Sequence, residues 1–356
     1  MIGIFTFHDT TNFGATLQAV ATYKALEELG VKSEIINYHC KQIDIRELPQ
    51  YAIKREKNKI EAILYFCLKG YKYCKKHRML YDFLCKETKV SKEKYSRNNV
   101  NLTKNIYDKF LIGSDMLWCT KFTEDDRTFF LDFLNDKSKK FAFATSVGYA
   151  WDSAEVEEIK AYLLNFCRIA VREADVADLI SKLIGKEVDT VCDPTMLVAP
   201  SIWRKYTDKI EEKYYLVYMD DNNQSGLHAA MELAHNCKAK VRQIEFSIWG
   251  RRKKEYEIME CYSIPDFLSA IANAEMLFTA SYHGMLFAIY FHIPFVYYNK
   301  DSSRLEGVAR RFRLTGRNGT KYKVSEMKDI DWEEVDKFRE KYAVESLKIL
   351  KEMMVS

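Results

Sequence analysis

The chain has 356 residues, of which 47% are apolar, and its formal net charge is +4. A chain of this length buries more than one hydrophobic core, so we expect two domains. No apolar run reaches membrane-spanning length, and Met1 runs directly into the strand-like IGIFTF, which favours a cytoplasmic protein without a signal peptide. The nine cysteines form no Cys-x-x-Cys pair, so we expect reduced thiols and no metal site.

The positive charge is concentrated between residues 53 and 109, where 16 lysines and arginines stand against 6 acidic residues. Apolar residues recur among the cations, as in IEAILYFCLKGYKYCKKHR, which predicts amphipathic helices. Two interpretations are open: an ordinary helical insertion with a solvated lysine face, or a helix that lies peripherally on an anionic inner membrane surface. Nucleic acid is not an expected partner, because the total charge is modest and no nucleic-acid-binding motif occurs.

Strands and helices alternate along the first 200 residues, which predicts a parallel sheet covered by helices. The expected strands are IGIFTF, SEIINY, KFLIGSD, KKFAFATSVG, RIAVRE and VDTVCDP. Outside the basic stretch, the expected helices are Ala15–Leu29, which Gly30 ends, Ser153–Asn165 and Asp175–Ile184.

A second α/β series follows. Its expected strands are YYLVYMD, KVRQIEF, MLFT and VYYN, and its expected helices are Gln224–Cys237, Pro265–Asn273, a buried helix that Pro294 stops, and a basic helix through Arg310. The stretch 331–354 is helical by its period.

These two series define the predicted domains. We expect an N-terminal domain at 1–200 with a basic helical insertion at about 44–109, a C-terminal domain at 201–330, and a C-terminal helix at 331–356 that can pack back on the first domain. The predicted fold class is α/β, with two Rossmann-like domains facing a cleft in the glycosyltransferase-B manner. In such sheets ligands bind outside the carboxyl ends of the strands.

The run TASYHGMLFAIYFHIPF places His283 and Gly284 where a strand passes into a helix. Free backbone N–H groups and the positive end of the helix dipole favour an anion at such a position, and a glycine lets a ligand approach the main chain. The alternative is that His283 is a capping or hydrogen-bonded core histidine. The position at a strand end favours the binding site.

Polar side chains also follow the strands of the first half. HDTTNFGATLQA offers candidate ligands for a hydroxylated substrate, although helix capping by Asp9, Thr10 or Thr11 explains much of this loop; the candidates are His8, Asn12, Gly14 and Gln18. In IGSDMLW, Ser114 and Asp115 follow a strand, where an aspartate accepts a proton from a sugar hydroxyl or caps a helix.

Several arginines are candidates for holding an anion. Arg172 in AVREAD ends a strand and is either part of an internal salt bridge or an oxyanion ligand. KDSSRLEGVARRFRL offers a phosphate or carboxylate clamp, with surface arginines as the commoner explanation; the residues concerned are Ser303, Arg304, Arg310, Arg311 and Arg313. Neither a G-x-G-x-x-G nor a P-loop motif occurs, so we expect no dinucleotide cofactor and no bound cofactor of another kind.

In this order, seven segments resemble the polysaccharide pyruvyl transferase family. They are TFHDTTNFGATLQAVATYKAL, FLIGSDMLW, FFLDF with KKFAFATSVG, AVREADVADLI, DPTMLV, PDFLSAIANAEMLFTASYHGMLFAIYFHIPF and SRLEGVARRFRL. The resemblance implies a glycosyltransferase-B-like fold and the transfer of pyruvate from phosphoenolpyruvate onto two hydroxyls of a saccharide as a ketal.

The same resemblance implies roles for individual residues. His283 would bind or protonate phosphoenolpyruvate, and Arg172 would hold the anionic donor. Asp115 or His8 could activate the acceptor, a saccharide or lipid-linked oligosaccharide. Characterised members commonly carry an arginine where this chain has Ser281, and Arg304, Arg310 or Arg311 are the candidates to replace it.

Two alternatives belong to other classes. The first is a glycosyltransferase that uses a sugar nucleotide, with the helix at His283 holding a diphosphate. The second is a non-catalytic glycan-binding or assembly protein of a surface-polysaccharide system. The polar residues at several separate strand ends speak against the second, because a scaffold has no need of them.

Overall fold

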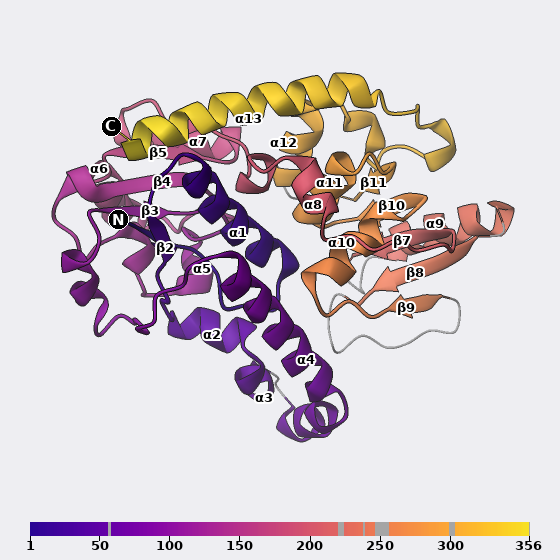
Figure 1. Cartoon of the computed structure of the whole chain (residues 1–356), viewed down its shortest axis with the longest axis horizontal. Helices are drawn as coiled ribbons and strands as arrows, with labels where there is room; N and C mark the ends of the chain where they lie inside the picture. Colours follow the sequence, from indigo (N-terminus) through magenta and orange to yellow (C-terminus); the bar gives the residue numbers. More distant parts are fainter. Residues whose placement is uncertain (56–57, 220–223, 238, 246–255, 299–302, 356) are drawn as a thin grey trace. The chain divides into compact units, whose positions relative to one another are not determined.

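The computed structural model describes residues 1–55, 58–219, 224–237, 239–245, 256–298 and 303–355 (Figure 1). The chain divides into two compact units. Unit 1 consists of Met1–Ile63, Leu80–Val198 and Lys341–Ser356. Unit 2 consists of Leu64–Met79 and Ala199–Glu340.

Unit 1 contains a parallel sheet of six strands in the order β2-β1-β3-β4-β5-β6. Its strands are β1 (Ile2–Phe5), β2 (Ser33–Ile35), β3 (Lys109–Ile112), β4 (Lys140–Thr145), β5 (Arg168–Val171) and β6 (Asp189–Thr190). Its helices are α1 (Phe13–Glu28), α2 (Lys41–Glu47), α3 (Ala52–Arg55), α5 (Thr120–Thr123), α6 (Val156–Leu164) and α7 (Ala174–Ile184). α4 (Lys59–Glu87) belongs to unit 1 at its two ends and to unit 2 in its middle.

Unit 2 contains a second parallel sheet, of five strands in the order β11-β10-β7-β8-β9. The strands are β7 (Tyr214–Tyr218), β8 (Lys240–Ile244), β9 (Glu257–Met259), β10 (Met276–Thr279) and β11 (Phe295–Tyr297). The helices are α8 (Pro200–Arg204), α9 (Gln224–Cys237), α10 (Ile264–Ala272), α11 (Tyr282–Tyr290) and α12 (Ser303–Arg311). α13 (Trp332–Val355) starts in unit 2, and its residues from Lys341 onward belong to unit 1.

The strand order reverses once in each sheet. In unit 1 the chain moves from β1 to β2 on one side and then places β3 on the other side of β1. In unit 2 it moves from β7 through β8 to β9 and then places β10 on the other side of β7. Such a reversal leaves a crevice outside the carboxyl ends of the two strands concerned. The topology therefore predicts a ligand-binding position at the carboxyl ends of β1 and β3 in unit 1, and another at those of β7 and β10 in unit 2.

Most expected elements are present, with shifted ends. α1 begins two residues earlier than expected because Asn12 is its N-cap, with its side chain accepting from the N–H groups of Gly14 and Ala15. The capping function is therefore that of Asn12 and not of Asp9, Thr10 or Thr11. β9 was not expected, because only three residues pair with β8. The last residues of the expected strands 214–220, 240–246 and 296–299 lie outside the described part of the chain.

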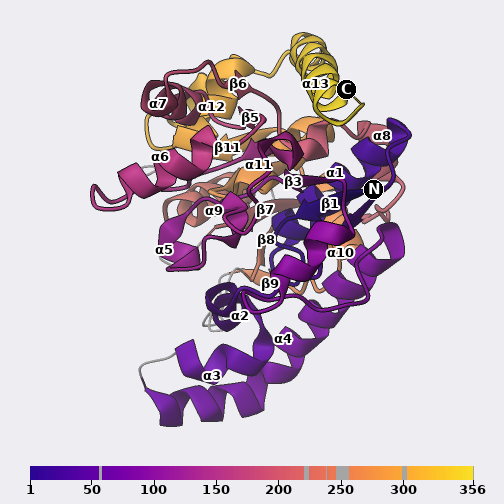
Figure 2. The same cartoon turned by 90° about the vertical axis from the view of Figure 1, so that its left-hand side faces the viewer.

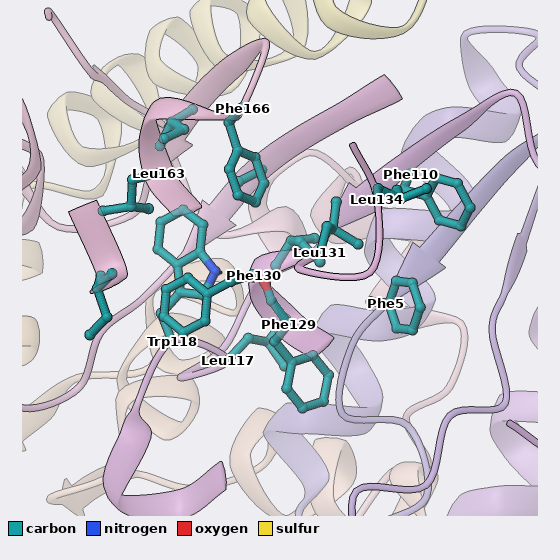
Figure 3. Packing of buried hydrophobic residues seen from close by; sticks show 14 of the residues in the cluster. Phe5, Phe110, Leu117, Trp118, Phe129, Phe130, Leu131, Leu134, Leu163 and Phe166 are labelled. Atoms are coloured by element: carbon teal, nitrogen blue, oxygen red, sulfur yellow. Dashed lines mark hydrogen bonds between the residues drawn. The ribbon is translucent and has the colours of Figure 1, made fainter. Parts of the chain in front are cut away.

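Aromatic side chains dominate the core of unit 1 (Figure 3). Phe5 at the end of β1 packs on Phe110 of β3, with ring centroids 6.2 Å apart. The connection that follows β3 is folded into the same core, where Trp118 stacks on Phe130 at 5.7 Å and donates its indole N–H to Phe129 O at 2.9 Å. Burial of these rings fixes the backbone just after Asp115, since interiors are close-packed.

Helix α4 carries the basic stretch and is the long purple helix in the lower part of Figure 2. Lysines recur along it, and no helix in the described ranges combines the length and apolar character needed to cross a membrane. Each of the nine cysteines is a free thiol.

The cap of α1 gives a test of the fold. Asn12→Ala should lower the free energy of unfolding by about 0.5–2 kcal/mol, because the N–H groups of Gly14 and Ala15 lose their acceptor. Urea unfolding measures this change. Asn12→Ser keeps a capping oxygen and should stay close to the parent; equal losses for both variants would contradict the assignment.

Candidate functional site

In unit 1 the loops after β1 and β3 meet at the strand-order reversal. β1 and β3 are hydrogen-bonded neighbours, and Thr6 Oγ1, just after β1, donates to Ser114 O at 3.4 Å. Asp115 has φ +83°, and its carbonyl oxygen accepts from Ser146 N at 2.9 Å. A non-glycine residue in this backbone region is strained, and such strain persists where the surroundings impose it, often at functional sites.

A small pocket opens beside Asp115. It is lined by side chains from the loop after β1, from α1, α2 and α5, and from the loop after β3, namely Phe7, Thr10, Asn12, Ala15, Ile43, Arg46, Glu47, Asp115, Met116 and Phe122. Glu47 accepts from Thr10 Oγ1 at 2.9 Å, and the guanidinium of Arg46 lies 3.6 Å from the ring centroid of Phe122. The pocket thus combines carboxylates, an arginine and apolar rings, a set that suits a hydroxylated ligand.

Three residues expected in the acceptor site make internal contacts. Gly14 donates its N–H to the Asn12 cap. Gln18 is fully buried and donates from Nε2 to Thr6 Oγ1 at 2.7 Å and to Ala15 O at 2.9 Å. Ser114 is also fully buried. Of the expected acceptor residues, only Asn12 and Asp115 line the pocket, and the binding role of the others stays a prediction.

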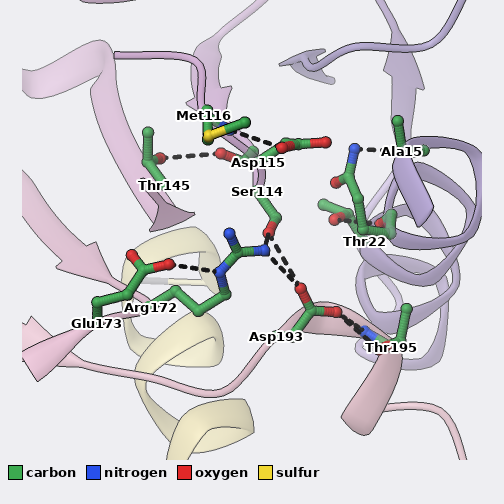
Figure 4. Close-up of polar contacts among 12 residues, drawn as sticks. Ala15, Thr22, Ser114, Asp115, Met116, Thr145, Arg172, Glu173, Asp193 and Thr195 are labelled. Atoms are coloured by element: carbon green, nitrogen blue, oxygen red, sulfur yellow. Dashed lines mark hydrogen bonds and ion pairs between the residues drawn. The ribbon is translucent and has the colours of Figure 1, made fainter. Parts of the chain in front are cut away.

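Arg172 takes the internal salt-bridge alternative (Figure 4). Its Nη1 lies 2.9 Å from Asp193 Oδ2 and its Nε lies 3.0 Å from Glu173 Oε1. Nη1 also contacts Ser114 Oγ at 3.4 Å, while Asp193 Oδ1 accepts from Thr195 N at 3.0 Å. The guanidinium is 2% exposed and matched by two carboxylates, so it holds strand ends together, and its expected role as a donor ligand stays a prediction. Asp193, which was not identified from the sequence as a site residue, is part of this cluster.

His8 is not among the residues that line this pocket; it lines a second pocket with Tyr38 and Asp44 and belongs to a second polar chain. It is 3% exposed, and its ring nitrogens face Thr6 O at 3.2 Å and Asn37 Oδ1 at 3.1 Å. Burial lowers the pKa of His8. A neutral imidazole has one N–H, so it donates to only one of these acceptors. The same Asn37 oxygen lies 3.0 Å from His39 Nε2, and the hydrogen bond that His39 Nδ1 donates to the Asp44 carboxylate raises the pKa of His39.

In unit 2 the reversal falls between β7 and β10, which are hydrogen-bonded neighbours. Ser281 is the N-cap of α11, and its side chain accepts from Gly284 N at 3.2 Å. Thr279 Oγ1 accepts from Ser281 N at 2.9 Å and donates to Tyr218 O at 2.9 Å. Burial raises the pKa of Tyr218, and the hydrogen bond of its hydroxyl with Ser281 opposes this increase. Tyr218, which ends β7, was not identified from the sequence.

His283 and Gly284 occupy the first turn of α11 as expected, but Gly284 has a packing role. A Cβ at this position would lie 2.8 Å from Thr279 Oγ1 and 3.2 Å from Tyr218 Cδ1, so glycine allows the helix to approach the strand ends. The expected approach of a ligand to the main chain at this glycine stays a prediction. His283 precedes this glycine in the chain. Its ring is edge-on to the ring of Tyr282, with the two ring centroids 5.3 Å apart.

The arginines of α12 belong to a helix that packs against α11. Arg304 lies in its first turn and is half-buried. Arg310 is mostly exposed and pairs with Glu306 at 3.6 Å. Arg313, just after α12, pairs with Glu334 at 2.7 Å, and its role in an anion clamp stays a prediction. The side chain of Ser303 lies outside the described residues. In the described ranges, no three histidine, cysteine, aspartate or glutamate side chains are placed to hold a metal ion.

Two parallel α/β units of this kind define the glycosyltransferase-B type of fold, and solved structures share it. One is UDP-GlcNAc 2-epimerase from Neisseria meningitidis bound to UDP-GlcNAc, with a TM-score of 0.53 and 10% identity over 99% of each chain. Another is UDP-GlcNAc 2-epimerase from Methanocaldococcus jannaschii in complex with UDP-GlcNAc and UDP, with a TM-score of 0.50 and 13% identity over 94% of this chain and 97% of that one.

Residues 12–302 match the family described as polysaccharide pyruvyl transferase, and the chain belongs to this family. The matched range includes the loop after β3 with Asp115 and the start of α11 with His283. None of the curated protein sequences matches the chain.

The Arg172 cluster can be tested by stability. Asp193→Ala should lower the free energy of unfolding by about 3–5 kcal/mol, because it removes one partner of a buried ion pair. Glu334→Ala, which breaks the exposed pair with Arg313, should cost less than about 1 kcal/mol. Urea unfolding of both variants measures the difference. Similar small losses would show that the cluster does not hold the strand ends.

The pair of His39 and Asp44 gives a pH dependence. Because the folded pKa of His39 is raised, its pairing stabilises the protein fully below the ordinary histidine pKa of about 6.5, and this stability is lost as the pH rises through the folded value. Asp44→Asn should therefore lower the melting temperature more at pH 6 than at pH 9. Asp178→Asn, an exposed change on α7, is the control. A loss for Asp44→Asn that is independent of pH would exclude this coupling.

Proposed function

We propose that the protein transfers the pyruvyl group of phosphoenolpyruvate onto two hydroxyls of a saccharide as a ketal, in the biosynthesis of a cell-surface polysaccharide. The observation that carries this proposal is the family match over residues 12–302, which contains the loop after β3 with Asp115 and the start of α11 with His283. In this proposal the donor is phosphoenolpyruvate, and the reaction uses no bound cofactor. The acceptor is a saccharide or a lipid-linked oligosaccharide.

The proposed chemistry begins at the donor. A proton adds to the methylene carbon of phosphoenolpyruvate, and positive charge develops on the neighbouring carbon. An acceptor hydroxyl attacks that carbon and loses its proton, phosphate leaves with the electrons of its C–O bond, and a second hydroxyl closes the ketal as it loses its own proton. A general acid contributes roughly 10² to 10⁴ in rate to such a step, and cations and helix N-termini stabilise the departing phosphate.

We assign the donor to the first turn of α11. His283 is placed there to protonate the methylene carbon or to hold the phosphate. Ser281 is occupied as the cap of the helix and does not offer the cation that its counterpart offers in related proteins. Arg304 replaces that cation in our proposal, because α12 packs against α11 and Arg310 is already paired with Glu306. Backbone N–H groups at the helix start add to the site.

We assign the acceptor to the pocket beside Asp115 in unit 1. The carboxylate of Asp115 lines the pocket and accepts from Met116 N at 2.8 Å, which orients it. A carboxylate so held takes the proton of an attacking hydroxyl. His8 is buried behind the pocket lining, so we give it a positioning role through Asn37 and His39. Glu47 and Arg46 add hydrogen-bonding groups for the sugar.

A sugar-nucleotide glycosyltransferase is the second candidate. The observation that favours it is the fold shared with an epimerase bound to UDP-GlcNAc, together with the absence of an arginine at position 281. A non-catalytic glycan-binding protein is a third. Thermal shift separates the three, since only a ligand that prefers the folded state raises the melting temperature. Phosphoenolpyruvate should stabilise the first, uridine or guanosine sugar nucleotides the second, and neither the third.

The decisive measurement is phosphate release from phosphoenolpyruvate with a panel of lipid-linked and nitrophenyl glycosides. Release that depends on one glycoside supports the proposal. Turnover of a sugar nucleotide without any phosphate release from phosphoenolpyruvate would replace it by the second candidate.

His283→Ala should lower turnover by about 10² to 10⁴ if this side chain supplies the acid. His228→Ala, at an exposed position of α9 in the same unit, should leave turnover unchanged. Steady-state rates of phosphate release compare the two variants. Near-normal activity of His283→Ala would remove this histidine from the mechanism.

A further inference from the structure

Helix α4 has two apolar faces, and among the described residues only one of these faces is buried. The inner face is buried through Ala62, Tyr73, Leu80 and Leu84. The outer face is exposed: the side chains are 82% exposed at Ile60, 50% at Ile63, 63% at Leu64, and 74% at both Leu68 and Tyr71. Five of the fourteen exposed large hydrophobic residues in the described structure therefore lie on this one helix.

These five residues form a continuous stripe, which we call the outer stripe. Their spacings of three and four residues place them on one side of a helix. The exposed Cys67 and Cys74 fall on the same side. Single exposed apolar residues are ordinary, but a contiguous exposed stripe indicates a surface that another body covers.

Positive charge exceeds negative charge in this part of α4. Between residues 59 and 78 the sequence holds six lysines and arginines against one acidic residue. Lys69 and Lys72 lie on the inner side, where they pair with Glu245 and Glu260 of unit 2. Lys75 lies 4.5 Å from the ring centroid of Tyr262. These contacts hold the middle of α4 to unit 2 and keep the outer stripe turned to solvent. Arg78, one turn further along the outer side, is exposed.

We propose that the outer stripe lies in the interface of an anionic phospholipid membrane, with the helix parallel to the surface. An exposed apolar stripe, an excess of cations in the same helix and too many charges to span the bilayer are features of an interfacial helix. Lysines and arginines near the surface are attracted by anionic headgroups. This inference rests on α4 alone and is independent of the proposed activity.

A second copy of the chain is the other possible occupant. Pairing two identical outer stripes would bring together two helices that carry the same excess of positive charge, with Arg78 exposed on the outer side of each, which is unfavourable. An anionic bilayer instead complements both the apolar stripe and its cations. The charge distribution therefore selects the membrane.

Vesicle co-sedimentation of the full chain tests the proposal without any substrate. The protein should bind vesicles of phosphatidylglycerol and phosphatidylcholine, and it should bind pure phosphatidylcholine vesicles more weakly. Leu64→Gln with Leu68→Gln should weaken binding by at least about tenfold, because two leucines no longer leave water. The control is Val344→Gln, which changes a side chain that is 69% exposed on α13. Circular dichroism checks that the variants stay helical.

Arg78→Gln measures the electrostatic contribution to vesicle binding. It should weaken binding to the anionic vesicles by about fivefold, the effect of one cation near the surface, and added salt should reduce the difference. Equal binding of the parent and the double leucine variant would overturn the proposal. So would sedimentation equilibrium that shows a dimer which the leucine changes dissociate, because the stripe would then be an interface between copies.

Discussion

The unit 1 sheet depends on one buried charge. Parallel strands end at the same edge, and the loops that leave that edge carry polar groups that must find partners. Arg172 supplies these partners by joining Ser114, Glu173 and Asp193, which follow β3, β5 and β6. The cluster gives the loop with Asp115 a fixed support, and the aromatic core around Trp118 holds its other side. The strained backbone of Asp115 is possible because both supports are rigid.

Much of the fold follows from the sequence. The alternation of apolar runs with helical stretches predicted the two parallel sheets, and Asp115 and His283 could be located because both stand directly after an apolar strand. These positions become candidate sites because of the order of the strands in each sheet, and the hydrophobic pattern of the sequence does not predict that order. β9 escaped prediction because three residues at a sheet edge make too short a pattern.

Other parts of the candidate sites depend on tertiary contacts. Arg46 and Glu47 come from the basic insertion and reach the pocket only because α2 packs beside the loop after β1. Tyr218 gains its place from the pairing of β7 with β10. For Arg172, the sequence allowed an internal pair or an anion ligand, and only the positions of Glu173 and Asp193 decided between them. The cap at Asn12 was hidden among four neighbouring residues with capping side chains.

Ser281 couples residues that are distant in the chain. Its hydroxyl satisfies Gly284 N–H and meets the hydroxyl of Tyr218, while Thr279 holds its backbone. An arginine introduced here would bring a cation to the helix start but would remove the cap and leave the Tyr218 hydroxyl to find a new partner. Serine at this position therefore has two packing roles at once, and an exchange for arginine would disturb both the start of α11 and the end of β7.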